Sequence, residues 1–212
     1  MNEFISKRNE TVAKNMIPFL EKRGFEGYFA KDKEEAKKIA LDLIKEGSSV
    51  TWGGTVSAEE IGLKSALKEG NYVVYDRAEA KNEDEVQEIY RKAYFCDYFL
   101  ASANAITEKG EIVNIDGNAN RVSAIAFGPK NVLFIVGVNK IVKDVEDGLT
   151  RARNYSAPIN GMRLGLSTPC AKTGVCMDCM APDCMCCQFM ITRKSKVPGR
   201  IKVILVNENL GF

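Results

Sequence analysis

The sequence contains no histidine. This absence excludes histidine as a general acid or base, the Ser-His and Cys-His nucleophilic pairs, and imidazole ligands for a metal. Any proton transfer must therefore be carried out by carboxylates, lysine, tyrosine or cysteine. A site for a soft metal must likewise be built from thiolates.

Long apolar segments are also missing. The longest run, Val132 to Val138, is far too short to cross a bilayer and is typical of a buried strand. The first residues of the chain carry mixed charges and contain no apolar core of signal-peptide length. We therefore expect a cytoplasmic protein that does not enter a membrane.

Neither sign of charge predominates, because 30 Lys and Arg residues face 28 Asp and Glu residues and the net charge is +2. This balance gives no strong attraction to nucleic acid or to a membrane surface. The stretch from Arg193 to Lys202 is basic, but it lacks the interleaved aromatic residues of a single-strand binding platform. We interpret it as a solvated surface and expect no nucleic-acid partner.

Strand-like and helix-like patterns alternate along the chain. A β-hairpin is expected at 105–116, and the segment 158–198, rich in Gly, Pro and Cys, is expected to be irregular. The alternation predicts one α/β domain over residues 1–212, with a mostly parallel sheet and helices on both faces. The other strands are expected at 25–30, 48–52, 72–75, 96–101, 132–138 and 201–206.

The first turn that could carry chemistry follows the strand at 48–52. Its residues Gly53 and Gly54 would let a ligand approach the backbone, and Thr55 and Ser57 precede a helix whose N-terminus favours an anion. The alternative is a tight strand-to-helix turn without a ligand. In either case, residues 57–60 are expected to form a capping box.

Two further turns also follow strands. Residues 114–121 combine Asn and Asp, which suit turns, with Arg121 in the first turn of a helix, where the helix dipole disfavours a cation. Arg121 therefore serves either an anionic ligand or a buried acid. Lys140, after the strand at 132–138, is either a site residue or a solvated lysine. Because ligands of parallel sheets bind outside the carboxyl ends of strands, we expect the three turns to converge on one crevice.

Six of the seven cysteines lie between Cys170 and Cys187, and only Cys96 lies elsewhere. Such packing in a chain without an export signal favours a metal site in a reducing compartment. Four thiolates suit zinc or an iron–sulfur cluster, although the spacing differs from that of the ferredoxins. A redox-active or disulfide-bonded loop, and thiols without a role, are the alternatives.

Several segments resemble the LUD-domain (lactate-utilisation) family. Trp52–Ser57 with Glu60–Gly62 resembles its glycine turn, the block 104–121 resembles its central motif, and 127–140 continues the similarity. The resemblance covers nearly the whole chain. The loop at 168–188 resembles the cysteine tail of short, stand-alone members in its ligand set Cys170, Cys176, Cys179 and Cys186, to which Cys184 and Cys187 are alternates.

The resemblance implies a fold like that of the ribose-5-phosphate isomerase, glucosamine-phosphate deaminase and CoA-transferase group, and a small anionic or phosphorylated ligand. The CoA transferases use a glutamate nucleophile, for which Glu108 and Glu111 are nearby candidates. The ligand-binding residues that it implies are Gly53, Gly54, Thr55, Ser57, Asn104, Thr107, Asn114, Asp116, Gly117, Asn120, Arg121 and Lys140.

Three functions remain open from the sequence. The first is an enzyme or enzyme subunit of organic-acid, lactate-type metabolism that binds its ligand at the strand ends. The second is an electron-transfer or redox-sensing module that uses an iron–sulfur cluster, zinc or thiols and meets redox partner proteins. The third is a regulatory domain that binds a ligand without chemistry. A homodimer is an open alternative to a monomer.

Overall fold

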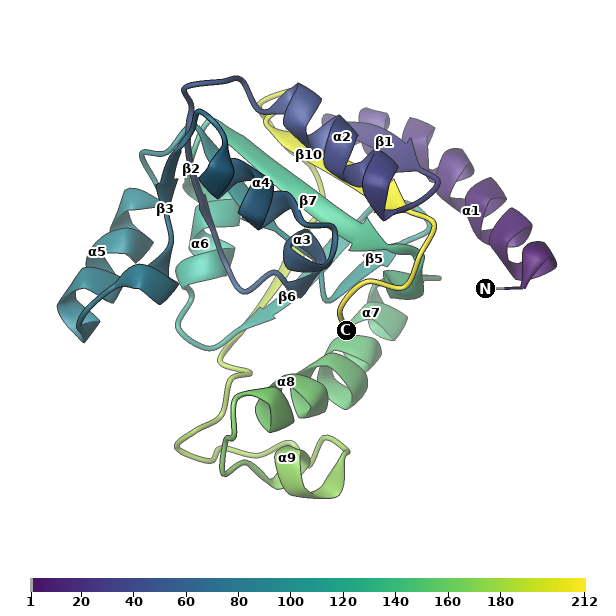
Figure 1. Ribbon diagram of the computed structural model, residues 1–212. Coiled ribbons are helices and arrows are strands. Elements are labelled where there is room, and N and C mark those ends of the chain that lie inside the picture. Colours follow the sequence, from purple (N-terminus) through teal and green to yellow (C-terminus); the bar gives the residue numbers. More distant parts are fainter. Residues whose placement is uncertain (1) are drawn as a thin grey trace.

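Six parallel strands form the main sheet in the computed structural model, which describes residues 2–212 (Figure 1). Their order across the sheet is β1-β10-β7-β4-β2-β3, and every pair of neighbours is parallel. The α/β prediction is therefore confirmed. The strands are β1 (Phe25–Ala30), β2 (Ser49–Trp52), β3 (Val73–Tyr75), β4 (Tyr98–Ala101), β7 (Asn131–Gly137) and β10 (Ile201–Val206).

Helices cover both faces of this sheet, as the alternating pattern predicts. On β7, Leu133 and Ile135 belong to one core and Val132, Phe134 and Val136 belong to the other, because successive side chains of a strand point to opposite faces. One face packs against α2 (Lys33–Leu43), α3 (Val56–Glu60) and α4 (Leu63–Glu69), and the other against α1 (Glu3–Lys22) and α6 (Asn120–Phe127). A further helix, α5 (Glu83–Lys92), lies beyond β3 at the edge (Figure 1).

The capping of α3 differs from the prediction. Thr55, not Ser57, is its N-cap and accepts a hydrogen bond from the Ala58 backbone N–H at 3.3 Å. Ser57 lies inside the first turn and is fully buried. The expected single helix is also split in two, because Gly62 adopts a left-handed conformation with φ of 71° between α3 and α4.

A second sheet packs on the α1–α6 side of the main sheet. Its strands are β5 (Ala105–Thr107), β6 (Ile112–Asp116), β8 (Ile141–Val142) and β9 (Gln188–Thr192), in the order β8-β5-β6-β9. The predicted hairpin is β5–β6 and is antiparallel. β9 runs antiparallel to β6 along its whole length and so ties the cysteine segment to the sheet.

The segment 158–198 is therefore irregular only in part, because it contains two helices and a strand between its loops. A continuous helical segment begins as α7 (Val145–Arg151), passes through a π-helical turn, η3 (Ala152–Ser156), and continues as α8 (Ala157–Arg163). A short helix, α9 (Pro169–Thr173), follows. α8 and α9 lie below the main sheet in Figure 1. Within residues 2–212, no helix is both long enough and apolar enough to cross a membrane.

Candidate functional site

A pocket of about 540 Å³ lies at the carboxyl ends of the main sheet. This volume is in the usual range for small-molecule sites. All three turns singled out in the sequence contribute to its wall, through Gly54, through Asp116 to Arg121, and through Lys140. The expected convergence of the turns is thus a feature of the fold.

The topology explains the position of this pocket. β2 and β4 are neighbours in the sheet. After β2 the chain enters α3 on one face, whereas after β4 it enters β5 of the second sheet on the other face. The two connections separate at this point, and a crevice opens between the strand ends, as it does at switch points of doubly wound sheets.

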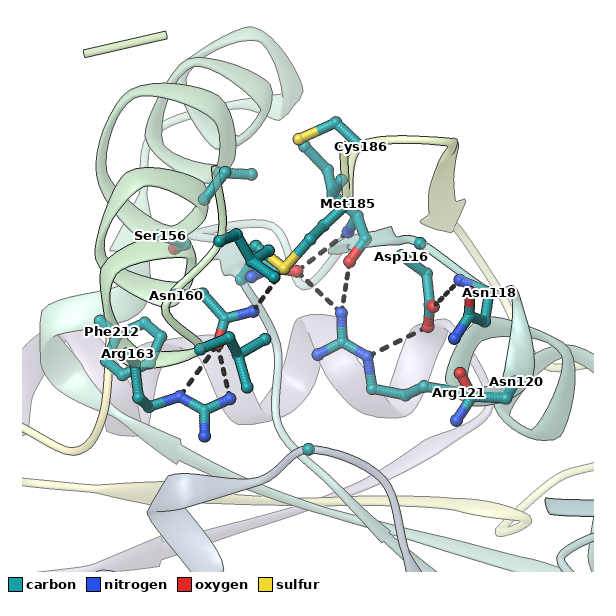
Figure 2. Close-up of a pocket in the computed structure, with 18 of the residues that line it drawn as sticks. Asp116, Asn118, Asn120, Arg121, Ser156, Asn160, Arg163, Met185, Cys186 and Phe212 are labelled. Atoms are coloured by element: carbon teal, nitrogen blue, oxygen red, sulfur yellow. Dashed lines mark hydrogen bonds and ion pairs between the residues drawn. The ribbon is translucent and has the colours of Figure 1, made fainter. Parts of the chain in front are cut away.

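Arg121 lies at the centre of the pocket wall (Figure 2). Its Nη2 donates to Asn104 Oδ1 at 3.2 Å and to the Ile115 carbonyl, and its Nε lies 3.5 Å from Asp116 Oδ2. Burial lowers the pKa of Arg121, and Asp116 counteracts this effect. Nη1 makes no hydrogen bond with any of residues 2–212, and the guanidinium points toward Asn160 and Met185 in Figure 2.

Asp116 holds this turn together. Its carboxylate accepts the backbone N–H groups of Asn118 and Val122, both at 3.2 Å, in addition to the ion pair with Arg121. Ala119, the N-cap residue of α6, has a left-handed φ of 61° and provides no side-chain cap. The turn therefore presents an arginine and the start of a helix to the pocket, and both favour an anion.

Positive charge predominates around the pocket. Arg77 and Arg163 join Arg121 as cations in its wall, which Lys140 also lines, whereas Asp116 and Asp183 are its carboxylates. Arg163 is exposed and donates to Asn160 Oδ1 at 3.0 Å. These residues from α8 and from the turn after β3 complete a basic wall.

Lys140 is not a solvated lysine, since its side chain is only 3% exposed. Its Nζ donates to Ser102 Oγ at 3.0 Å and to Ser57 Oγ at 3.2 Å. Burial, together with the positive charges of Arg151 and Arg121, lowers its pKa to about 7. The structure therefore places an amine of unusual acidity in the wall of the pocket.

The structure brings most of the implied ligand-binding residues together. Gly53 lies behind Arg121, and Thr55 and Gly53 line a neighbouring hollow. Ser57 contacts Lys140, and Asn114 is buried with its Nδ2 bonded to the Ser102 carbonyl at 3.0 Å. Those in the pocket wall itself are Gly54, Asn104, Asp116, Gly117, Asn120, Arg121 and Lys140.

Three residues of the implied site lie elsewhere. Glu111 forms an ion pair with Arg23 and a hydrogen bond with Thr107 in the β5–β6 hairpin. Glu108 is exposed in the same turn, and its backbone N–H donates to the Val142 carbonyl at 2.8 Å. None of Thr107, Glu108 and Glu111 lines the pocket.

Several pocket residues escaped the sequence analysis. Ser102 follows β4, so the strand-end rule that identified the three turns could have found it. Ser156 and Asn160 belong to η3 and α8, and Arg163 ends α8, in or beside the segment expected to be irregular. A π-helical turn often marks a functional site, but it has no reliable sequence signal.

The cysteine segment closes one side of the same pocket. Cys184, Met185 and Cys186 line it, and the Cys187 backbone N–H donates to the Asp116 carbonyl at 3.0 Å. A Cβ added to Gly117 would lie 3.3 Å from Met185 Cα, so glycine permits this close approach. The loop and the crevice therefore border the same pocket.

The thiols of this segment lie close to one another. Burial raises the pKa of Cys186 to about 12, and the nearby Cys184, Cys176 and Cys170 contribute to the rise. The Cys186 backbone N–H favours the Cys184 thiolate, but burial and the thiols of Cys179 and Cys187 outweigh it and raise the pKa of Cys184. We call these residues the thiol cluster: Cys170, Cys176, Cys179, Cys184, Cys186 and Cys187.

The thiol cluster has the donor chemistry of a zinc or iron–sulfur site. Within residues 2–212, however, no three or more Cys, Asp or Glu side chains are arranged around a common metal position, and every cysteine is an unpaired thiol. Cys96 lies apart, where burial raises its pKa to about 11. The donors fit such a group, but closing them around a metal requires the side chains to move.

Comparisons with known structures agree with this fold. A DUF162 family protein from Deinococcus radiodurans superposes with a TM-score of 0.52 at 14% identity, over 93% of this chain and 98% of that chain. Two weaker similarities are eIF2B delta from Chaetomium thermophilum (TM-score 0.37, 14% identity, 66% and 54% of the chains) and a Pseudomonas malonate decarboxylase hetero-tetramer in complex with malonate (0.40, 12%, 84% and 38%).

The sequence comparisons identify the family. None of the curated proteins matches the chain significantly. A family model described as the LUD domain matches residues 13–206, which include the main sheet, the thiol cluster and every residue of the pocket wall except Phe212. The chain belongs to the LUD-domain family.

Proposed function

We propose that this protein binds a small organic anion, a carboxylate or a phosphate ester, in the pocket at the strand ends. One observation carries the proposal: Arg121 is fixed by Asp116, Asn104 and Ile115, yet its Nη1 has no partner among residues 2–212. A fixed guanidinium with unused donors is suited to a carboxylate or phosphate oxygen.

The surroundings of Arg121 support the same ligand. The cations of the pocket wall outnumber its two carboxylates, and one of these, Asp116, is already paired with Arg121. The other, Asp183, is exposed and accepts the Ser167 backbone N–H at 3.2 Å. An entering anion therefore meets a surplus of positive charge. A lactate-type organic acid fits both this chemistry and the family.

The proposal is tested by isothermal titration calorimetry with lactate, pyruvate and ribose 5-phosphate. We expect at least one to bind, and Arg121→Gln to weaken it by about 10- to 100-fold, as for loss of one charge-assisted hydrogen bond. Arg91→Gln, at an exposed position on α5, is the matched control and should bind normally.

Arg163→Gln tests the same pocket without risking a folding defect, because Arg163 is exposed and its side chain donates hydrogen bonds only to Asn160. It should weaken binding in a fully folded protein. Equal affinity of wild type, Arg121→Gln and Arg163→Gln for every ligand that binds would refute the proposal.

The thiol cluster favours a second function. We propose that it holds zinc or an iron–sulfur cluster, or acts as a thiol-based redox group. The proposal rests on the proximity of the six thiols and on their placement against the pocket. When bound, a cluster would supply electron transfer and zinc would supply rigidity. The elemental analysis given in the Discussion is its test.

A further inference from the structure

Lys140 has an arrangement that neither proposed function uses. It lines the pocket together with Ser102, and its Nζ donates to both Ser102 Oγ and Ser57 Oγ. Ser102 donates its own hydroxyl hydrogen to the Ile135 carbonyl at 2.7 Å, and the two serine oxygens lie 3.2 Å apart. Since the Ser102 hydrogen is used, Ser57 donates to Ser102.

This arrangement of hydrogens accommodates an uncharged amine without leaving either of its N–H groups unpaired. Each serine oxygen can only accept from Lys140, because both hydroxyl hydrogens are committed elsewhere. A neutral amine has two N–H groups and one lone pair. The two serines satisfy both N–H groups of the neutral amine and leave its lone pair free, whereas a charged ammonium group would keep a third N–H without a partner among residues 2–212.

The charges around Lys140 also favour the neutral form. No carboxylate of residues 2–212 lies within ion-pairing distance of Nζ, whereas buried lysines that serve structure are usually paired with one. Arg151 and Arg121 repel a charge at this position, and Glu60 attracts it more weakly. With a pKa of about 7, about half of the amine is unprotonated at neutral pH, as a nucleophilic lysine requires.

We propose that Lys140 is a nucleophile that forms a Schiff base with a small carbonyl compound bearing an anionic group. The inference rests on the proposed binding function, because the anionic group would be held at Arg121 while the carbonyl carbon meets Nζ. Both 2-oxo acids and phosphorylated aldoses combine a carbonyl group with an anionic group. The two arms of the experiment below distinguish these two substrate classes.

The step balances without an added oxidant or reductant. The lone pair of Nζ attacks the carbonyl carbon, the C–N bond forms, and the carbonyl π electrons move to oxygen. Both hydrogens of the neutral amine pass to this oxygen as the C–O bond breaks and water leaves. The nitrogen electrons released by this loss form the C=N bond, so one carbonyl and one amine give one imine and one water.

The test is reductive trapping with sodium cyanoborohydride. The protein is incubated with pyruvate in one arm and with ribose 5-phosphate in the other, and adducts are located by peptide mass spectrometry. We expect one secondary-amine adduct, at Lys140, in at least one arm. Its rate of formation should be half-maximal near pH 7 rather than near the ordinary lysine value of 10.5.

The matched variants are Lys140→Met and Lys143→Met. Methionine fills the buried site without the amine, and Lys143 is an exposed lysine three positions away. The adduct should be lost in Lys140→Met and retained in Lys143→Met, with both variants shown to be folded by circular dichroism. An adduct that persists in Lys140→Met overturns the inference.

Binding and trapping separate the two proposals. If calorimetry shows that either compound binds through Arg121 and no adduct forms, the Schiff-base inference is wrong and the anion site stands. If neither compound binds and no adduct forms, the inference fails for both substrate classes, and the anion site then depends on lactate alone.

Discussion

The backbone of Gly53 lies directly against the side chain of Arg121. A Cβ at position 53 would come within 2.9 Å of Arg121 Cγ and 3.1 Å of its Cδ, with the ring of Phe99 at 3.2 Å. Real Cβ contacts are almost never that short. Gly53, in the turn after β2, therefore leaves room for the side chain of Arg121, which follows β6.

Gly53→Ala should displace Arg121 and weaken anion binding. Overpacking of this kind also costs about 1–3 kcal/mol of stability. Gly54→Ala is the control for the cost in stability only, because its nearest atom would be Arg77 Nη2 at an ordinary 3.8 Å. Urea unfolding of both variants checks the stability cost, and calorimetry compares Gly53→Ala with the wild type, whose equal affinity for the anion would contradict the prediction.

Removal of Asp116 should destabilise the protein strongly. Asp116→Ala leaves the buried Arg121 without its carboxylate and removes the acceptor of two backbone N–H groups. Breaking a buried pair in this way costs about 3–5 kcal/mol. Asp183→Ala removes an exposed carboxylate from the same pocket and should change the free energy of unfolding by about 0.5 kcal/mol or less.

Glu111 should act on stability and not on ligand binding. Burial alone would raise its pKa, but hydrogen bonds from Thr107 and its own backbone N–H, together with Arg23, hold the pKa below the usual 4.5. A carboxylate of lowered pKa stabilises the fold above its unfolded pKa, and this contribution disappears as pH falls through the folded pKa.

Glu111→Gln should therefore flatten the loss of thermal stability below pH 4.5, with unchanged affinity for the anion. Glu108→Gln, at the exposed position of the same turn, should leave the pH profile as in wild type. Melting temperatures of the wild type and of both variants, measured from acid to neutral pH, test this prediction. Loss of anion binding in Glu111→Gln would contradict this prediction and would make Glu111 a residue of the binding site.

Metal analysis of anaerobically purified protein tests the thiol cluster. Iron with visible absorbance indicates an iron–sulfur cluster, and colourless protein with stoichiometric zinc indicates a structural site. Cys186→Ser should lose the metal, whereas Cys96→Ser, outside the cluster, should retain it. Metal-free protein with oxidised thiols would instead support disulfide chemistry.

The main sheet is predictable because each strand is a short apolar run between turn signals. β9 is not, since it has five residues, alternates toward solvent and is flanked by cysteines and basic residues. Its partner is β6, more than seventy positions earlier. A pairing at that distance is set by tertiary packing, not by local pattern.

The site was only partly predictable for the same reason. Arg121 was recognisable because a cation at a helix N-terminus opposes the dipole. The burial of Lys140 was not, because it depends on Ser57 and Ser102 from two other turns. Thr55 and Ser57 both carry hydroxyls suited to a cap, and only the backbone shows which one performs it.

Cys186 belongs both to the thiol cluster and to the pocket wall. A metal or disulfide that shifts this segment would therefore change the affinity of the pocket for its anion by some factor. Thermodynamic reciprocity then requires the anion to change the metal affinity, or the reduction equilibrium of the thiols, by the same factor. The cysteine segment would therefore respond both to occupancy of the pocket and to the redox state of the cell.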